Sequence, residues 1–99
     1  MITQITIKGK EHPFCYGFGA LMAAEELLGG KIDATNRATL IMMWACLFNG
    51  DNDFPYDPMA LGRLIDTEDG LYYQLDNALK VQLERWGKPS QSEGDKKKD

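Results

Sequence analysis

The spacing of apolar residues changes once near the N-terminus, and this change restricts the fold more than any other feature of the chain. Up to about Tyr16, apolar and polar residues alternate as in a β-strand, whereas from Ala20 onward the apolar residues recur at helical spacing. A two-stranded hairpin is not stable alone in water. The strand segment must therefore lay its apolar face on the helices that follow it.

The segment before the change has the pattern of a β-hairpin. Residues 2–8 are rich in β-branched side chains, which favour strands. Residues 9–11 fit a tight turn, so the returning strand is expected from residue 12 to residue 16 or 18. Pro13 lacks a backbone donor and favours an edge position in the sheet.

Residues 20–28 form the first expected helix, because their apolar side chains share one face. The paired glycines 29 and 30 end it. Gly17 and Gly19 are expected to let the backbone turn sharply from strand to helix. The hairpin would then fold against this helix.

The next helix is expected over residues 37–50, with no polar face along Leu40–Phe48. A helix that is apolar all round is buried, either at the centre of the fold or partly under a partner. Its apolar run is about half of the roughly 20 residues that span a bilayer, so a membrane segment is not expected.

Two further helices complete the pattern. Asp57 and Pro58 predict a helix start, with Asp as the N-cap and Pro at the first helical position. Residues 67–69 would cap a last helix that ends at Gly87. The inward positions expected on these two helices are Met59 or Ala60, Leu61, Leu64 and Ile65, then Leu71, Leu75, Ala78 or Leu79, Gln82 or Leu83, and Trp86.

The sequence thus predicts an α+β fold, in which an N-terminal two-stranded antiparallel β-hairpin packs on a cluster of about four α-helices. Hairpin and helices form a single α+β domain over residues 1–88. Residues 89–99 are expected to be a disordered tail, because no residue from Ser90 onward is apolar enough to enter a core.

The overall composition is that of a globular protein without a strong charge signal. Hydrophobic residues make up 43% and charged residues 26%, which argues against disorder of the whole chain. A net charge of -4 gives no electrostatic footprint for nucleic acid. The N-terminus lacks the apolar stretch of a signal peptide, and two cysteines are too few for a disulfide framework, so the cytoplasm is the expected compartment.

Patterns of catalytic or metal-binding residues are not found. His12, the only histidine, is interpreted as a surface residue beside a turn, and Cys15 falls on the opposite face of the strand. The acidic loop 51–57 lacks the glycine and the glutamate that an EF-hand requires. The chain is therefore not expected to be an enzyme, and no catalytic residue, cofactor or metal ligand is assigned.

Aromatic residues are the best candidates for a partner-binding surface. One group lies in the acidic loop 51–57 and the other on the last helix, and a contiguous exposed patch would mark a partner site. The alternative is that they cover the small core. The candidate partner-binding residues are Phe54, Tyr56, Tyr72, Tyr73 and Trp86. A homo-oligomer is compatible with the sequence.

The opening segment resembles a known family. It contains a strand, a turn with the pattern GKE-P, a strand ending in FG and a helix beginning with AL, and the later MALGRLID is similar to that family's third helix. This pattern resembles the phage tail tube assembly chaperones of siphophages and of related prophages or gene-transfer elements. The likeness covers residues 5 to about 86. The positions that carry it in the opening segment are Gly9, Lys10, Glu11, Pro13, Phe18, Gly19, Ala20, Leu21, Glu25 and Gly30.

The resemblance implies a non-enzymatic role in phage morphogenesis. Such chaperones hold tail tube subunits and contact the tape-measure protein until the tube polymerises, and they are not part of the finished tail. The implied place of action is the cytoplasm of the host cell, without nucleic-acid or membrane partners. Several members are also made in a longer form by ribosomal slippage, for which the codons of Lys96–Lys98 are a candidate site.

Two other functions are left open by the sequence. One is a structural tail completion or connector component. The other is a small DNA-binding regulator of a mobile element, since short helices in series permit a helix-turn-helix. The candidate recognition helix, residues 58–65, carries only Arg63 as a cation that can read bases.

Overall fold

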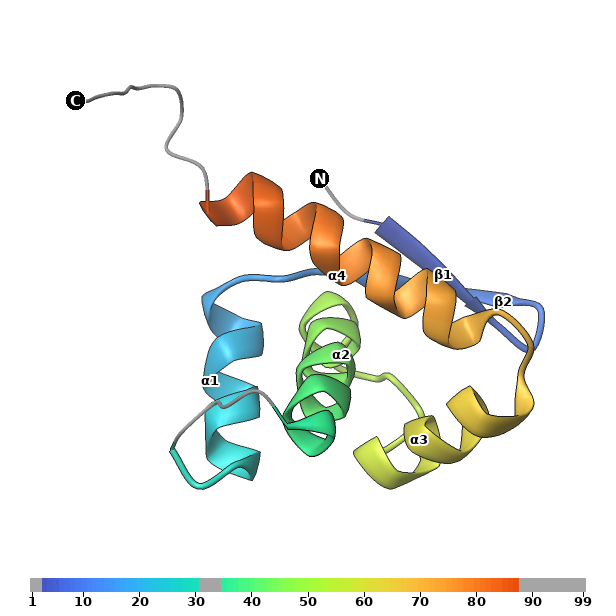
Figure 1. Cartoon of the computed structure of the whole chain (residues 1–99), viewed down its shortest axis with the longest axis horizontal. Helices are drawn as coiled ribbons and strands as arrows, with labels where there is room; N and C mark the ends of the chain where they lie inside the picture. The colour runs from blue at the N-terminus through green and yellow to red at the C-terminus, as the bar shows by residue number, and fades with distance from the viewer. Residues whose placement is uncertain (1–2, 31–34, 88–99) are drawn as a thin grey trace.

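Six elements make up the part of the chain that the computed structural model describes, residues 3–30 and 35–87, with side chains as far as Arg85 (Figure 1). The expected α+β architecture is confirmed, because an antiparallel two-stranded hairpin is followed by four helices. The expected tail, residues 89–99, lies outside the described residues. The elements are β1 (Thr3–Ile7), β2 (Lys10–Phe14), α1 (Phe18–Leu27), α2 (Asn36–Gly50), α3 (Pro58–Thr67) and α4 (Leu71–Gly87).

The hairpin turns earlier than the sequence predicted. Ile7 pairs with Lys10, so Lys8 and Gly9 alone form the loop, and β2 covers residues 10–14 instead of 12–16 or 12–18. Both loop residues have positive φ, 52° at Lys8 and 80° at Gly9. Two-residue loops of this kind match the right-handed twist of the strands, and glycine takes such a φ without steric cost.

The hairpin packs on α2 and α4, so the prediction that it folds against α1 was wrong. In Figure 1, α2 lies at the centre of the helical cluster between α1 and α3, while α4 lies beside the hairpin. The connection after β2 is drawn onto α2, because the Cys15 N–H donates to the Cys46 carbonyl at 3.0 Å. Asn49 Nδ2 also donates to the Cys15 carbonyl, at 3.0 Å. α1 then packs along α2.

Of the two glycines at the start of α1, Gly19 is the one that close packing requires. Gly17 has an extended backbone, with φ 166°, that any residue adopts. A Cβ on Gly19 would collide with the side chain of Asn49, which its hydrogen bond to Cys15 holds in place. Glycine is therefore required where the start of α1 meets the end of α2.

α1 ends at the paired glycines, as predicted. Gly29 has φ 78°, and the Gly30 N–H donates to the Glu25 carbonyl at 2.6 Å. The Gly29 N–H donates to the Glu26 carbonyl at 3.5 Å. These two bonds form a Schellman motif, which satisfies carbonyls that a helix end leaves unpaired.

α2 is the buried centre of the fold, as its apolar composition predicted. Thr35 caps it, because its Oγ1 accepts a hydrogen bond from the Ala38 N–H at 3.1 Å. At the last turn of α2, a Cβ on Gly50 would lie 2.5 Å from the carbonyl oxygen of Pro13. The backbone of β2 can approach α2 this closely because Gly50 has no side chain. The buried residues of α2 are Ala38, Ile41, Met42, Met43, Ala45, Cys46 and Leu47.

α3 and α4 bury most of the positions that the sequence predicted. Asp57 caps α3 by accepting a hydrogen bond from the Ala60 N–H at 2.8 Å. Leu61 and Leu64 are buried, whereas Met59 is 64% exposed. The buried residues of α4 are Leu71, Leu75, Ala78, Leu79 and Gln82.

Two glutamines of α4 join this helix to the hairpin. Gln74 Oε1 accepts from the Thr6 N–H at 2.9 Å, and Gln74 Nε2 donates to the Thr6 carbonyl at 3.2 Å. Gln82 Nε2 donates to the Phe14 carbonyl at 2.8 Å, and Gln82 Oε1 accepts from the backbone N–H of Tyr16 at 2.7 Å. Because buried backbone groups need partners, Gln82 faces inward while Leu83 remains 42% exposed.

Candidate interaction surface

The aromatic residues predicted in the loop 51–57 lie against the core. Phe54 is 8% exposed, and its ring meets that of His12 edge-on with 5.2 Å between the centroids. The half-buried Tyr56 ring lies 5.5 Å from that of Phe54. Phe54 and Tyr56 therefore pack as the alternative interpretation expected, as residues that cover the core.

His12 is buried, which corrects its predicted place at the surface. Its side chain is 3% exposed, because the loop 51–57 folds over the strand face on which it lies. Burial and the charge of Lys10 lower the pKa of the imidazole, and the carboxylate of Asp51 opposes this shift. His12 is therefore a neutral core residue at neutral pH.

Hydrogen bonds fix the loop 51–57 in this position. Asp51 Oδ1 accepts from the Asp53 N–H at 2.9 Å, and Trp44 Nε1 donates to the Tyr56 carbonyl at 2.8 Å. The carboxylates of Asp51 and Asp57 thus serve turn and cap bonds. Within residues 3–30 and 35–87, no group of three side chains has the donors and spacing to hold a metal ion.

The tyrosines predicted on α4 are exposed, Tyr72 at 51% and Tyr73 at 74%. Because Phe54 is buried, the predicted aromatic residues do not come together as one exposed patch. The side chain of Trp86 lies outside the described residues. Of the four candidates whose side chains are described, Tyr72 is the one that borders a groove with α2 and α3.

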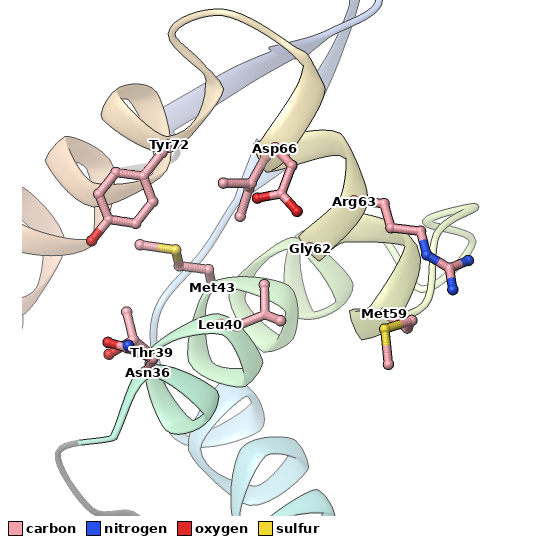
Figure 2. Close-up of a pocket in the computed structure, with 10 residues that line it drawn as sticks. Asn36, Thr39, Leu40, Met43, Met59, Gly62, Arg63, Asp66 and Tyr72 are labelled. Carbon is pink, nitrogen blue, oxygen red and sulfur yellow. The ribbon is translucent and has the colours of Figure 1, made fainter.

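This groove holds a volume of about 470 Å³ (Figure 2). Leu40 and Met43 of α2 line it from below, and the Met43 side chain lies between Tyr72 and α3 in Figure 2. Met59 and Ile65 contribute from α3. The remaining lining residues are Asn36, Thr39, Gly62, Arg63 and Asp66.

A second hollow of about 340 Å³ adjoins the first, because Leu40 and Met59 line both. Leu27, Ile41 and Pro58 add further apolar side chains to it. The two hollows thus form one apolar surface along the N-terminal half of α2. We call this surface the methionine groove.

Two arginines border the methionine groove. Arg63 lies on the first hollow and Arg37 on the second, and both side chains are exposed. They are the only lysine or arginine residues within the described stretches 15–30 and 35–70. Neither forms an ion pair with a described residue, and Arg37 donates one hydrogen bond to the Leu27 carbonyl at 3.2 Å. Asp66 is the single carboxylate in the lining.

The sequence prediction missed this groove. It placed Met59 or Ala60 inward and treated the whole of Leu40–Phe48 as buried, whereas Met59 is exposed and Leu40 is half-buried. The approach of α3 to α2 at Gly62, where a Cβ would lie 3.2 Å from Leu40, could not be seen from either helix alone. The available signal was the pair of arginines beside apolar positions on two different helices.

Exposed apolar side chains are not confined to the groove. Phe18 is 72% exposed and Met22 69% exposed, both on α1. Single exposed apolar residues are common in proteins, but a set that borders a hollow is typical of a binding surface. Among the residues with described side chains, the other large exposed apolar ones are Leu27, Met59, Tyr72, Tyr73, Val81 and Leu83.

The two cysteines are free thiols. Burial, with a smaller contribution from Cys15, raises the pKa of Cys46 to about 12. Cys46 is therefore a protonated core residue at neutral pH and not an activated nucleophile.

Comparison of the chain with protein-family models, with curated proteins and with solved structures finds no significant match. Over the described ranges, every helix is too short or too polar to cross a membrane.

Proposed function

We propose that this chain is a non-enzymatic phage or prophage tail assembly chaperone, which binds tail tube subunits and the tape-measure protein in the cytoplasm of the host cell. The observation that carries the proposal is the methionine groove. It leaves apolar side chains open to a partner even though the hairpin, α2 and α4 already enclose a core.

A groove of this kind suits temporary binding. A tail tube subunit exposes apolar segments until it polymerises, and covering them prevents premature association. Methionine side chains are unbranched and adapt to different partner shapes. Met59 is 64% exposed, whereas Met43 lies fully buried beneath the groove, so Met59 supplies the adaptable side chain that can cover such a segment and release it.

Residues that carry the resemblance to this family hold the fold in place. Gly9 forms the hairpin loop, Gly19 allows contact with Asn49, and Gly30 completes the Schellman motif of α1. These are the positions at which a shared fold requires particular residues, and this supports the resemblance.

Co-expression with the tail tube protein tests the proposal most directly. A tail tube gene upstream and a long tape-measure gene downstream would identify the protein to use. We expect the tagged full-length chain to retain the tube protein through size-exclusion chromatography and to be missing from purified phage particles by mass spectrometry. A chain that retains neither the tube protein nor the tape-measure protein would contradict the proposal.

The two alternative functions give different results in these experiments. A structural completion or connector component would be found in purified particles. A DNA-binding regulator would shift duplex DNA in a gel, and its binding would weaken as salt is added.

A further inference from the structure

We infer that the methionine groove docks an amphipathic α-helix of a partner protein in which Asp or Glu residues border the apolar stripe. This inference rests on the proposed function and names the kind of segment that the chaperone would hold.

The apolar part of the inference follows from the shape of the groove. Its two hollows, about 470 and 340 Å³, meet at Leu40 and Met59 and can take successive side chains of one segment. Large side chains at i, i+3 or i+4 and i+7 of a helix project on one side and enter such a surface as anchors. Met59 stands at the junction and is 64% exposed, so its side chain is available to an incoming helix.

The hydrogen-bonding groups of the molecule favour a helix over a strand as the occupant. The edge of β1 is already engaged at Thr6 by Gln74, and on the edge of β2 Pro13 has no N–H to offer. The groove itself is walled by helices, whose backbone groups bond internally. An extended segment lying there would leave its own backbone unpaired, whereas a helix satisfies its own.

The charges at the rim select the flanking residues of that helix. Arg37 and Arg63 border the groove on two different helices, and neither has an ion-pair partner among the described residues. Only Asp66 contributes a carboxylate to the lining. On a chain with net charge -4, this is a local basic rim around an apolar surface. A helix with carboxylates beside its apolar stripe complements it in both respects.

Synthetic peptides test this inference on the full-length chain. The probe is a fluorescein-labelled helical peptide of about 18 residues, or ~27 Å, with Leu and Met on one face and Glu beside them. A second peptide carries Lys in place of Glu, and a third has the apolar residues scrambled. By fluorescence anisotropy, we expect the Glu peptide to bind at least about tenfold more tightly than either of the others, and to weaken as salt rises.

Two substitutions at the groove have matched controls elsewhere. Met59→Ser should weaken binding of the Glu peptide by about tenfold, as the loss of an interface anchor does. Met22→Ser, which removes a methionine of similar exposure from α1, should leave it unchanged. Arg63→Glu should weaken the Glu peptide and strengthen the Lys peptide, whereas Arg85→Glu on α4 should do neither. Thermal melts check that all four variants remain folded.

Several results would overturn the inference. Equal binding of the Glu and Lys peptides would remove the role of the arginines. Loss of binding in Met22→Ser but not in Met59→Ser would place the site on α1. A dimer that Met59→Ser dissociates in analytical ultracentrifugation would show that a second copy of the chain occupies the groove.

The same variants separate this inference from the proposed function. If wild type and Met59→Ser retain the tail tube protein equally, the groove assignment fails and the chaperone role stands. If wild type binds the Glu peptide through Met59 but retains neither the tube nor the tape-measure protein, the chaperone role fails and the groove assignment stands.

Discussion

The hairpin interface and the methionine groove both involve α2 and α4, but the groove is built mainly between α2 and α3, and the two regions pack in opposite ways. At the hairpin interface, Gln74 and Gln82 bond backbone atoms of the strands, and Gly50 lets β2 lie against α2. At the groove, Met59 and Tyr72 stand beside open space and are largely exposed.

Under the proposed function, the hairpin interface stabilises the fold and the methionine groove recognises a partner. Hydrogen bonds to fixed backbone atoms allow one geometry, so the hairpin interface specifies the fold. The exposed Met59 side chain at the groove is unbranched and allows many geometries, so under the proposed function the groove would receive a partner without disturbing the core. Substitutions on the two sides should accordingly have different costs.

The largest difference is expected between Phe14→Ala and Met59→Ala. Phe14 is fully buried at the hairpin interface, and its truncation should lower the free energy of unfolding by about 4 kcal/mol. Met59→Ala should change it by less than about 0.5 kcal/mol, because the side chain is exposed. Urea denaturation measures both, and similar losses in the two variants would contradict the proposed division.

Alanine at two glycines should have opposite effects. Gly50→Ala places a Cβ against the Pro13 carbonyl and should cost about 3 kcal/mol, because neither backbone can move away easily. Gly62→Ala meets only the end of Leu40, which borders the open groove and can shift. The gain in helix propensity should then stabilise α3 by up to about 1 kcal/mol. Thermal unfolding of the two variants tests this pair, and a destabilised Gly62→Ala would mean that Leu40 is rigidly packed.

Replacing the buried glutamine should cost less than these changes but remain measurable. Gln82→Leu keeps a similar side-chain volume but leaves the Phe14 carbonyl without its side-chain partner. We expect this loss to lower the free energy of unfolding by about 2 kcal/mol. Gln74→Leu, whose bonds to Thr6 are exposed to water, should cost about 0.5–1 kcal/mol. Chemical denaturation distinguishes the two, and equal losses would show that burial of the Gln82 bonds has no special weight.

The smallest effect is expected from the titration of His12. Burial lowers the folded-state pKa of the imidazole below its ordinary value of 6.5, so the unfolded chain binds a proton more readily. The contribution of His12 is complete above pH 6.5 and is lost as the pH falls from there through the folded-state pKa.

The test compares the wild type with His12→Phe by urea denaturation at pH 7.5 and pH 5.5. The wild type should lose more stability on acidification than the variant, since carboxylate titration is common to both. An identical loss would show that His12 titrates alike in the folded and unfolded chains.

Local signals were sufficient to predict the order of the elements and several of the helix ends. The helix end at Gly29 and Gly30, the cap at Asp57 and the apolar character of α2 each depend on residues close together in the chain, and the structure confirms them. The hairpin was also predicted, but its loop was displaced, because Lys8 is not a residue that commonly takes positive φ.

Features that depend on distant residues could not be predicted in the same way. The burial of His12 depends on where the loop 51–57 folds, and the choice of Gln82 over Leu83 depends on Phe14, 68 positions away. The methionine groove arises from the meeting of four helices, because Leu27 of α1 and Tyr72 of α4 line it together with residues of α2 and α3. Among the predicted partner-binding residues with described side chains, only Tyr72 borders it, because helical spacing within α4 does not show which neighbours will leave a hollow.

The two glutamine bridges also hold both strands of the hairpin. Alternation of side chains tells a strand which face to turn inward, but a slip by two residues preserves that alternation. The two-residue loop sets the register, and Gln74 and Gln82 bind Thr6 on β1 and Phe14 on β2, so α4 holds both strands in that register. α4 thus holds the opening strands as well, and during synthesis its attachments can form only after residue 82 has emerged from the ribosome, whereas the contacts of Cys15 with α2 need only residues up to 49.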